Sequence, residues 1–217
     1  MRLFASATAA ILALTFAAAT PALAEFYGDV TRTFGDGKLG VEGAYTNLSR
    51  PVEFDGGGSD DLDYTELSAV ISRGVGGQGQ LMGRLGTVSI DTGGADEDGF
   101  GLGVGYRHTF GAGTDLPKGA FARFALVNAG DIQFTQIDVG FGVSHALEKN
   151  LRVYGGGLVS QLSGDVDTGF GKADFSEKHE IGLFGGGIFQ LDQSLGIGFE
   201  IHALFENGFV LLLEMAL

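Results

Sequence analysis

The residues best suited to acid–base chemistry are the four histidines, His108, His145, His179 and His202. No two of them stand four residues apart and the chain has no cysteine, so the usual zinc-binding spacings are absent. His202 follows Glu200 by two residues, which on a strand places both side chains on one face, as a lipid hydrolase with a Ser/His/acid group would require. No Gly-x-Ser-x-Gly pattern supplies the serine. We therefore expect no enzyme, with a lipid-modifying hydrolase as the less favoured alternative.

Short runs of aspartate are a second feature with chemical potential, and they occur in three polar stretches. The residues are Asp60, Asp61, Asp63, Asp96, Asp98, Asp165 and Asp167. Clustered carboxylates bind Ca²⁺ or Mg²⁺, and through such cations they could bridge to lipid phosphates. No stretch contains the complete twelve-residue calcium loop with its final Glu. The favoured interpretation is a solvated rim of mutually repelling charges, and we expect no cofactor and no metal.

A larger set of charged residues shares one face of the strands that the sequence predicts. It consists of Glu42, Glu66, Arg84, Arg107, Arg123, Asp138, Arg152, Glu180, Glu200 and Glu214. Isolated charges are costly in an interior, whereas paired and hydrogen-bonded charges are tolerated. Six acids and four arginines on the inner face of a closed sheet would therefore form a lumen charge network.

The elements that position these residues are β-strands, because large apolar residues alternate with Gly, small or charged residues along most of the chain. From Phe209 to Leu217, for example, every second residue is large and apolar, and Glu214 lies on the opposite parity. Side chains of a strand point to opposite faces in turn. We expect ten strands, near residues 38–48, 62–72, 79–90, 99–110, 119–128, 132–145, 151–162, 180–190, 195–205 and 208–217.

Two all-β architectures accommodate this alternation, and they differ in which face is inside. A soluble β-sandwich buries the apolar face, whereas a membrane barrel turns it toward lipid and lines its interior with polar residues. Gly101, Gly103 and Gly140 share the parity of the charged residues, where they would make room for bulky Arg and Glu side chains. We expect a closed antiparallel transmembrane barrel with a polar, largely filled lumen, and keep the sandwich as the alternative.

Composition and the first residues indicate export. Residues 1–24 begin with Met1-Arg2, continue as an apolar run and end in Ala22-Leu23-Ala24, the pattern of a cleaved signal peptide. We expect residues 25–37 to be a periplasmic lead or a lumen segment and residues 38–217 to be the barrel. The net charge of −14 argues against a nucleic-acid partner. With 39 glycines, an ordinary helical domain is excluded as well.

The connections are of two kinds. Residues 49–61, 91–98 and 163–179 form long polar connections that all fall at one end of the expected barrel, while most turns at the other end are short. Long extracellular loops and short periplasmic turns are typical of outer-membrane barrels. We therefore expect acidic extracellular loops at the end opposite the chain termini.

With its signal peptide, Gly-rich alternation and amphipathic last strand, the chain resembles the small outer-membrane β-barrel proteins of Gram-negative bacteria, the OmpA-like and opacity-protein-like group. The resemblance implies an outer-membrane location and contact with its lipid. It also implies recognition of the segment from Phe209 to Leu217 by the barrel-assembly machinery, although that segment ends in Leu rather than the usual Phe. Eight strands, the common number of that group, is the alternative to ten.

The function expected on this basis is a structural or surface-interaction role for a barrel with acidic loops. A narrow, porin-like channel is the alternative, in which the row of Arg84, Arg123 and Arg152 opposite lumen carboxylates would set selectivity.

Overall fold

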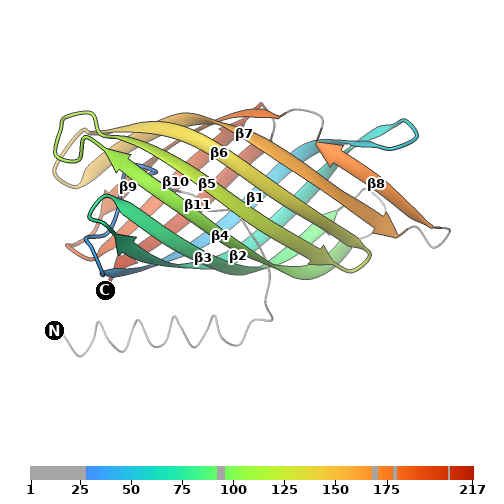
Figure 1. Ribbon diagram of the computed structural model, residues 1–217, viewed down its shortest axis with the longest axis horizontal. Coiled ribbons are helices and arrows are strands. Elements are labelled where there is room, and N and C mark those ends of the chain that lie inside the picture. The colour runs from blue at the N-terminus through green and yellow to red at the C-terminus, as the bar shows by residue number, and fades with distance from the viewer. Residues whose placement is uncertain (1–27, 92–95, 168–170, 178–179, 205) are drawn as a thin grey trace.

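The fold is a closed antiparallel β-barrel (Figure 1). The computed structural model describes residues 28–91, 96–167, 171–177, 180–204 and 206–217. Its strands are β1 (Leu39–Phe54), β2 (Ser59–Val75), β3 (Gly79–Asp91), β4 (Asp96–Phe110), β5 (Lys118–Ala129), β6 (Ile132–Ala146), β7 (Leu151–Asp167), β8 (Lys172–Glu177), β9 (Ile181–Gln190), β10 (Leu195–Ala203) and β11 (Asn207–Ala216). Pairing of β11 with β1 closes the sheet, so that no edge is left unpaired along the ring.

Two strands, β8 and β9, form one interrupted strand against β7. Ser163 of β7 pairs with Ser176 of β8, and Val159 pairs with Ile181 of β9, so β7 advances four residues while its partner advances five. This is the geometry of a bulge. Above the bulge, β8 also pairs with residues 52–54 of β1, beyond the ends of the short strands β10 and β11.

The barrel consequently changes its strand number along its axis. Ten strands, β1 to β7 and β9 to β11, surround the end that carries the C-terminus, and a smaller ring of β1 to β8 surrounds the opposite end. We call these the lower and the upper ring. The prediction of a ten-strand barrel is confirmed for the lower ring, while the extra short strand β8 was not foreseen.

In the lower ring the apolar face points outward. Leu211, Val139 and Leu102 are 48%, 56% and 53% exposed, whereas Glu66 and Arg123 on the opposite parity are 1% and 4% exposed. Exposed large apolar side chains occur on every strand of this ring. A continuous apolar outer belt over a charged interior is the arrangement of a transmembrane barrel, so the inside-out prediction is confirmed and the β-sandwich is wrong. Within the described ranges, no helix is long and apolar enough to cross a membrane.

In the upper ring the alternation continues but its polarity is reversed. Outward positions there are polar, among them Asn47, Asp63, Ser89, Asp98, Asn128, Gln133, Ser163 and Asp167. Inward positions are apolar and form one buried cluster that includes Leu48, Val52, Leu62, Ile90, Ile132, Phe134, Leu162 and Phe175. This part of the barrel is built like a soluble protein, with its apolar residues in the centre.

The reversal corrects two predictions. The connections expected over 49–61, 91–98 and 163–179 are largely strand, because the period of two continues through them; residues 92–95, 168–170 and 178–179 lie outside the described ranges. The interior is also not polar throughout, since an apolar cluster fills the upper ring. Both differences have one cause: water outside the wall favours an apolar interior.

The reversal predicts the effect of a new charge on the outer surface of β6. An arginine in place of Val139, within the apolar belt, should lower the free energy of unfolding by about 2–4 kcal/mol because its charge must enter hydrocarbon. Gln133→Arg, on the same face but in the upper ring, should cost at most about 1 kcal/mol. The unfolding free energies of both variants can be measured by urea titration in phospholipid vesicles, with the folded fraction monitored by gel migration. Equal losses in the two variants would contradict the assignment of the belt.

Candidate functional site in the barrel interior

The structure brings most of the predicted charged residues into the interior. Glu42, Glu66, Arg84, Arg107, Arg123, Asp138, Glu200 and Glu214 are buried on the inward face. Arg152 lies at the mouth of the lower ring, with its side chain 40% exposed. Glu180 is exposed, and its inclusion was wrong: it stands at the interruption between β8 and β9, where the alternation shifts by one residue.

Two ion pairs in the middle of the lumen join neighbouring strands. Arg84 donates to Glu66, with Nε–Oε1 at 3.2 Å and Nη2–Oε2 at 2.5 Å. Arg123 donates from Nε to Asp138 Oδ2 at 2.7 Å, and Gln136 Nε2 donates to the same oxygen at 2.8 Å. These residues connect β2 with β3 and β5 with β6, so the pairs stiffen the wall rather than form a row of free charges.

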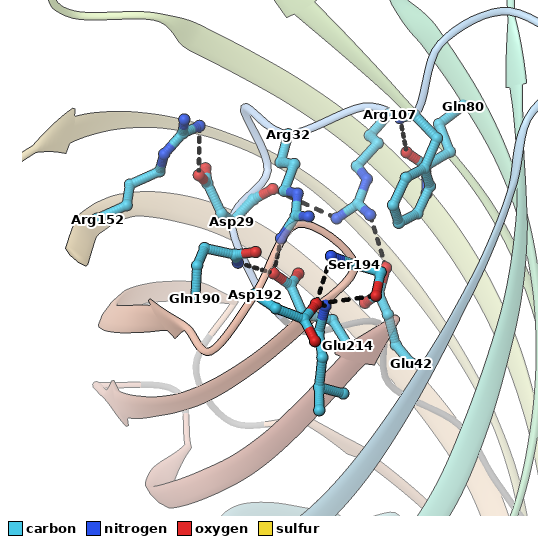
Figure 2. A network of polar contacts seen from close by, with 12 residues as sticks. Asp29, Arg32, Glu42, Gln80, Arg107, Arg152, Gln190, Asp192, Ser194 and Glu214 are labelled. Carbon is cyan, nitrogen blue, oxygen red and sulfur yellow. Dashed lines mark hydrogen bonds and ion pairs between the residues drawn. The ribbon is translucent and has the colours of Figure 1, made fainter. Parts of the chain in front are cut away.

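A second network surrounds residues 28–34, which precede β1 and enter the lumen (Figure 2). Asp29 accepts a bond from Arg152 Nη1 at 3.2 Å, and its backbone oxygen accepts one from Arg107 Nη1 at 3.3 Å. Arg107 also donates to Glu42 Oε1 at 2.8 Å. Arg32 forms an ion pair with Glu214. Each charged group of this segment is therefore met by an opposite charge from the wall.

Backbone bonds hold the same segment in register with the wall. Gly28 N donates to Glu200 Oε2 at 3.1 Å, and Phe34 N donates to Gln80 Oε1 at 3.2 Å. Thr109 Oγ1 donates to the Thr31 carbonyl at 2.9 Å. Residues 28–34 are thus in contact with the inner side of the wall; residues 25–27 lie outside the described ranges.

Four wall glycines form the seat of this segment. A Cβ at Gly40 would collide with the Phe34 ring, one at Gly74 with the Phe34 and Gly35 carbonyls, and one at Gly119 or Gly142 with Val30. Because these four glycines have no side chain, the segment can lie directly against the wall. The sequence predicted that inward glycines make room for Arg and Glu side chains, and the use of these four to seat residues 28–34 was not predicted.

A third group of charges lies where the lower ring meets the upper ring. Arg50, fully buried, pairs with Glu206, and its Nη1 lies 3.8 Å from Glu177 Oε1. Leu204, which follows β10, has a left-handed backbone with φ of 86°, and Glu206, which precedes β11, is fully buried. Arg50, Glu177 and Glu206 were not predicted. The available signal was Arg50, the charged residue between Leu48 and Val52 on the inward parity of β1.

His202 belongs to this third group. Its Nε2 lies 2.6 Å from Glu200 Oε1, and its Nδ1 lies 2.6 Å from Glu206 Oε1. A general base in a Ser/His/acid group uses one ring nitrogen for the acid and the other for the nucleophile. Here carboxylates contact both nitrogens, so the arrangement is that of a structural bridge.

Most of the predicted carboxylates lie on the outside of the upper ring, whereas Asp60, the register partner of the buried Val52, lies on the inward parity at its rim. Asp63 pairs in register with Asp91, and Asp91 with Asp96, so acidic side chains follow one another around the surface. Asp165 forms an ion pair with Lys172. Among the described residues, no group of three or more His, Cys, Asp or Glu has an arrangement that could hold a metal ion.

Neither a protein-family model nor a curated protein matches this chain. Among solved structures, the chain is similar to the translocator domain of the autotransporter NalP from Neisseria meningitidis, with TM-score 0.46, 11% identity and coverage of 98% of this chain and 96% of that chain. It is similar to an outer-membrane channel from Pseudomonas putida F1, with TM-score 0.41, 11% identity, and 88% and 99% coverage.

It is also similar to Ail, the attachment invasion locus protein of Yersinia pestis, with TM-score 0.37, 12% identity, and 83% and 97% coverage. Likeness at these identities and scores does not indicate a function for this chain.

The buried pair of Arg123 and Asp138 gives a stability prediction. Arg123→Met leaves the Asp138 carboxylate buried without its cation and should cost about 3–5 kcal/mol of unfolding free energy. The double variant Arg123→Met/Asp138→Leu should recover most of that loss, because no unpaired charge remains. Lys172→Met, which breaks an exposed pair, serves as the control and should change little. A double variant no more stable than Arg123→Met would contradict the pairing.

Glu177 lies above the apolar belt, and its burial makes the free energy of unfolding depend on pH. Burial raises the pKa of its carboxyl from 4.5 to about 7, against the opposing effect of Arg50. The folded chain therefore retains a proton that the unfolded chain releases, and the stability from this group is lost as the pH rises from 4.5 toward 7. Urea midpoints at about pH 5 and about pH 8 should differ less in Glu177→Gln than in the unmodified chain. Identical differences would show that Glu177 does not hold this proton.

Proposed function

We propose that this chain is a closed barrel of the bacterial outer membrane, which conducts no solute and acts through its fold and its exposed acidic surface. The observation that supports this most is the filling of the interior at both ends. Residues 28–34 occupy the lower end, and the apolar cluster occupies the upper ring. Export by the segment 1–24 and insertion through the strand that ends the chain are part of the proposal.

The upper closure is a packed apolar layer. The rings of Phe134 and Phe175 approach with centroids 6.4 Å apart, and those of Phe54 and Phe175 with centroids 5.9 Å apart. Ile90 and Ala129 in the same cluster are fully buried. A hydrophobic constriction excludes water and therefore ions. This layer would stop solutes even if the lower end were open.

The lower closure is held by charge pairs as well as by apolar contact. Val30 packs in a buried cluster with Phe121, Leu158 and Phe184. Beside Arg152, a cleft of about 210 Å³ remains at the lower mouth. The cleft is a shallow depression at the lower mouth, and residues 28–34 fill the lumen beyond it.

The exposed surface of the upper ring favours a role at the cell surface. Its outward side chains are acidic at Asp61, Asp63, Asp91, Asp98 and Asp167, whereas Lys172 is already paired with Asp165. Such a surface repels anionic surfaces and attracts cationic ones. A narrow channel remains the second candidate, supported by the charged pairs in the middle of the lumen. It would require displacement of both closures.

Planar-bilayer recording of the refolded chain tests this proposal. The chain should show no stable conductance steps, and a variant with residues 28–34 replaced by Gly and Ser should remain silent because the upper apolar layer persists. Heat-modifiable gel migration provides the control for folding. Stable single-channel steps from the unmodified chain would overturn the closed-barrel function and favour the channel.

A further inference from the structure

The outer wall of the barrel carries a groove across β1 to β4, with a volume of about 690 Å³. Its lining side chains on the outer face are Tyr45, Thr65, Leu67, Thr87, Ser89, Asp98 and Phe100. Glu66 and Val88, which also border it, turn their side chains into the barrel. The groove therefore faces the medium around the barrel and is separate from the lumen.

Strand register explains why the wall is hollow there. Tyr45, Leu67, Thr87 and Phe100 lie in one row across the four strands. Thr87 is much smaller than its neighbours Leu67 and Phe100, so the row has a gap between two large side chains. The next row toward the upper ring is Asn47, Thr65, Ser89 and Asp98, again of small or short side chains.

The groove lies where the outer surface changes from apolar to polar. Leu85 and Leu102, toward the lower ring, are exposed within the apolar belt. Asp63 and Asp91, toward the upper ring, are exposed to water. A molecule in the groove therefore meets hydrocarbon at one end and carboxylates at the other, which is the environment of a lipid headgroup joined to its chains.

The polar groups that line the groove include a negative charge and several hydroxyls. Asn47 Nδ2 donates to Thr65 Oγ1 at 3.1 Å, and the hydroxyls of Thr87 and Ser89 add donors and acceptors to the floor. Asp98 supplies a negative charge, and Asp91 and Asp63 lie beyond it. No lysine or arginine lines the groove. The charge complementarity therefore favours a cationic group over a bare phosphate.

We propose that this groove binds a lipid whose headgroup carries an ammonium group. The ammonium would lie at Asp98, the ester region at the Ser89 hydroxyl, and the start of an acyl chain over Thr87, in the gap between Leu67 and Phe100. A net anionic headgroup is disfavoured by the same carboxylates. This lipid site is independent of whether the lumen conducts.

Native mass spectrometry of the whole chain, released from micelles with phosphatidylethanolamine or phosphatidylglycerol, tests the proposal. The ethanolamine lipid should be retained about fivefold more strongly, the effect of one exposed ion contact. Asp98→Asn should abolish this preference. Thr87→Phe should reduce retention by filling the groove, whereas Thr135→Phe, on the outer face of β6, should leave it unchanged.

Gel migration establishes that each variant is folded. Equal retention of the two lipids by the unmodified chain would overturn the headgroup assignment, and so would stronger retention of phosphatidylglycerol. Equal retention by Thr87→Phe and Thr135→Phe would overturn the location, since lipid would then bind elsewhere on the wall.

Discussion

The wall of this barrel is a single sheet whose side chains alternate between its two faces. The medium outside the wall at each level therefore determines whether apolar or polar side chains point into the interior. Where hydrocarbon surrounds the lower ring, apolar residues such as Val139 and Leu211 are satisfied outside, and the interior contains paired charges. Where water surrounds the upper ring, the interior holds Ile90 and Leu162 instead. A single strand such as β6 runs through both rings. Its outward face is apolar in the lower ring and polar in the upper ring, and its inward face changes in the opposite sense.

The lower interior depends on charge neutralisation. Arg84, Arg107 and Arg123 are each paired with a carboxylate from the wall, and residues 28–34 bring Asp29 and Arg32 to complete the set. Removing one member of a buried ion pair leaves the other charge without compensation. The resulting loss of folding free energy is larger than the net stabilisation that the intact pair provides. The charges thus favour one seating of the segment, and the wall glycines provide the space for it. A filled interior is the consequence, and it underlies the proposed closed function.

Much of this fold could be predicted because alternation is a local property. Within each strand the large apolar residues share one parity, as Leu102 does with its neighbours in β4 and Val139 with its neighbours in β6, and this alternation identified the strands and the outward face. The reversal in the upper ring was missed, since Leu48, Val52 and Ile90 look equally apolar whichever medium faces the other side of the strand. Arg50, Glu206 and Glu177 meet only because β8 crosses to β1, and pairing between distant segments leaves no local signal.

The same limit explains Glu180 and residues 28–34. A bulge of one residue moves Glu180 off the inward parity, and such a bulge changes no pattern that a single sequence reveals. Residues 28–34 lack the period of two, and their place in the lumen follows from complementary glycines and charges spread over seven strands.

The reversal of polarity along β6 tests this account most directly, and the lack of native cysteine makes single spin labels straightforward. Labels at 133, 135, 137, 139 and 141, all on the outer face, would be compared for collisions with oxygen, which enriches in hydrocarbon, and with a water-soluble nickel complex. The account predicts nickel access at 133 and 135 and oxygen access from 137 to 141. Nickel access at all five positions would contradict it.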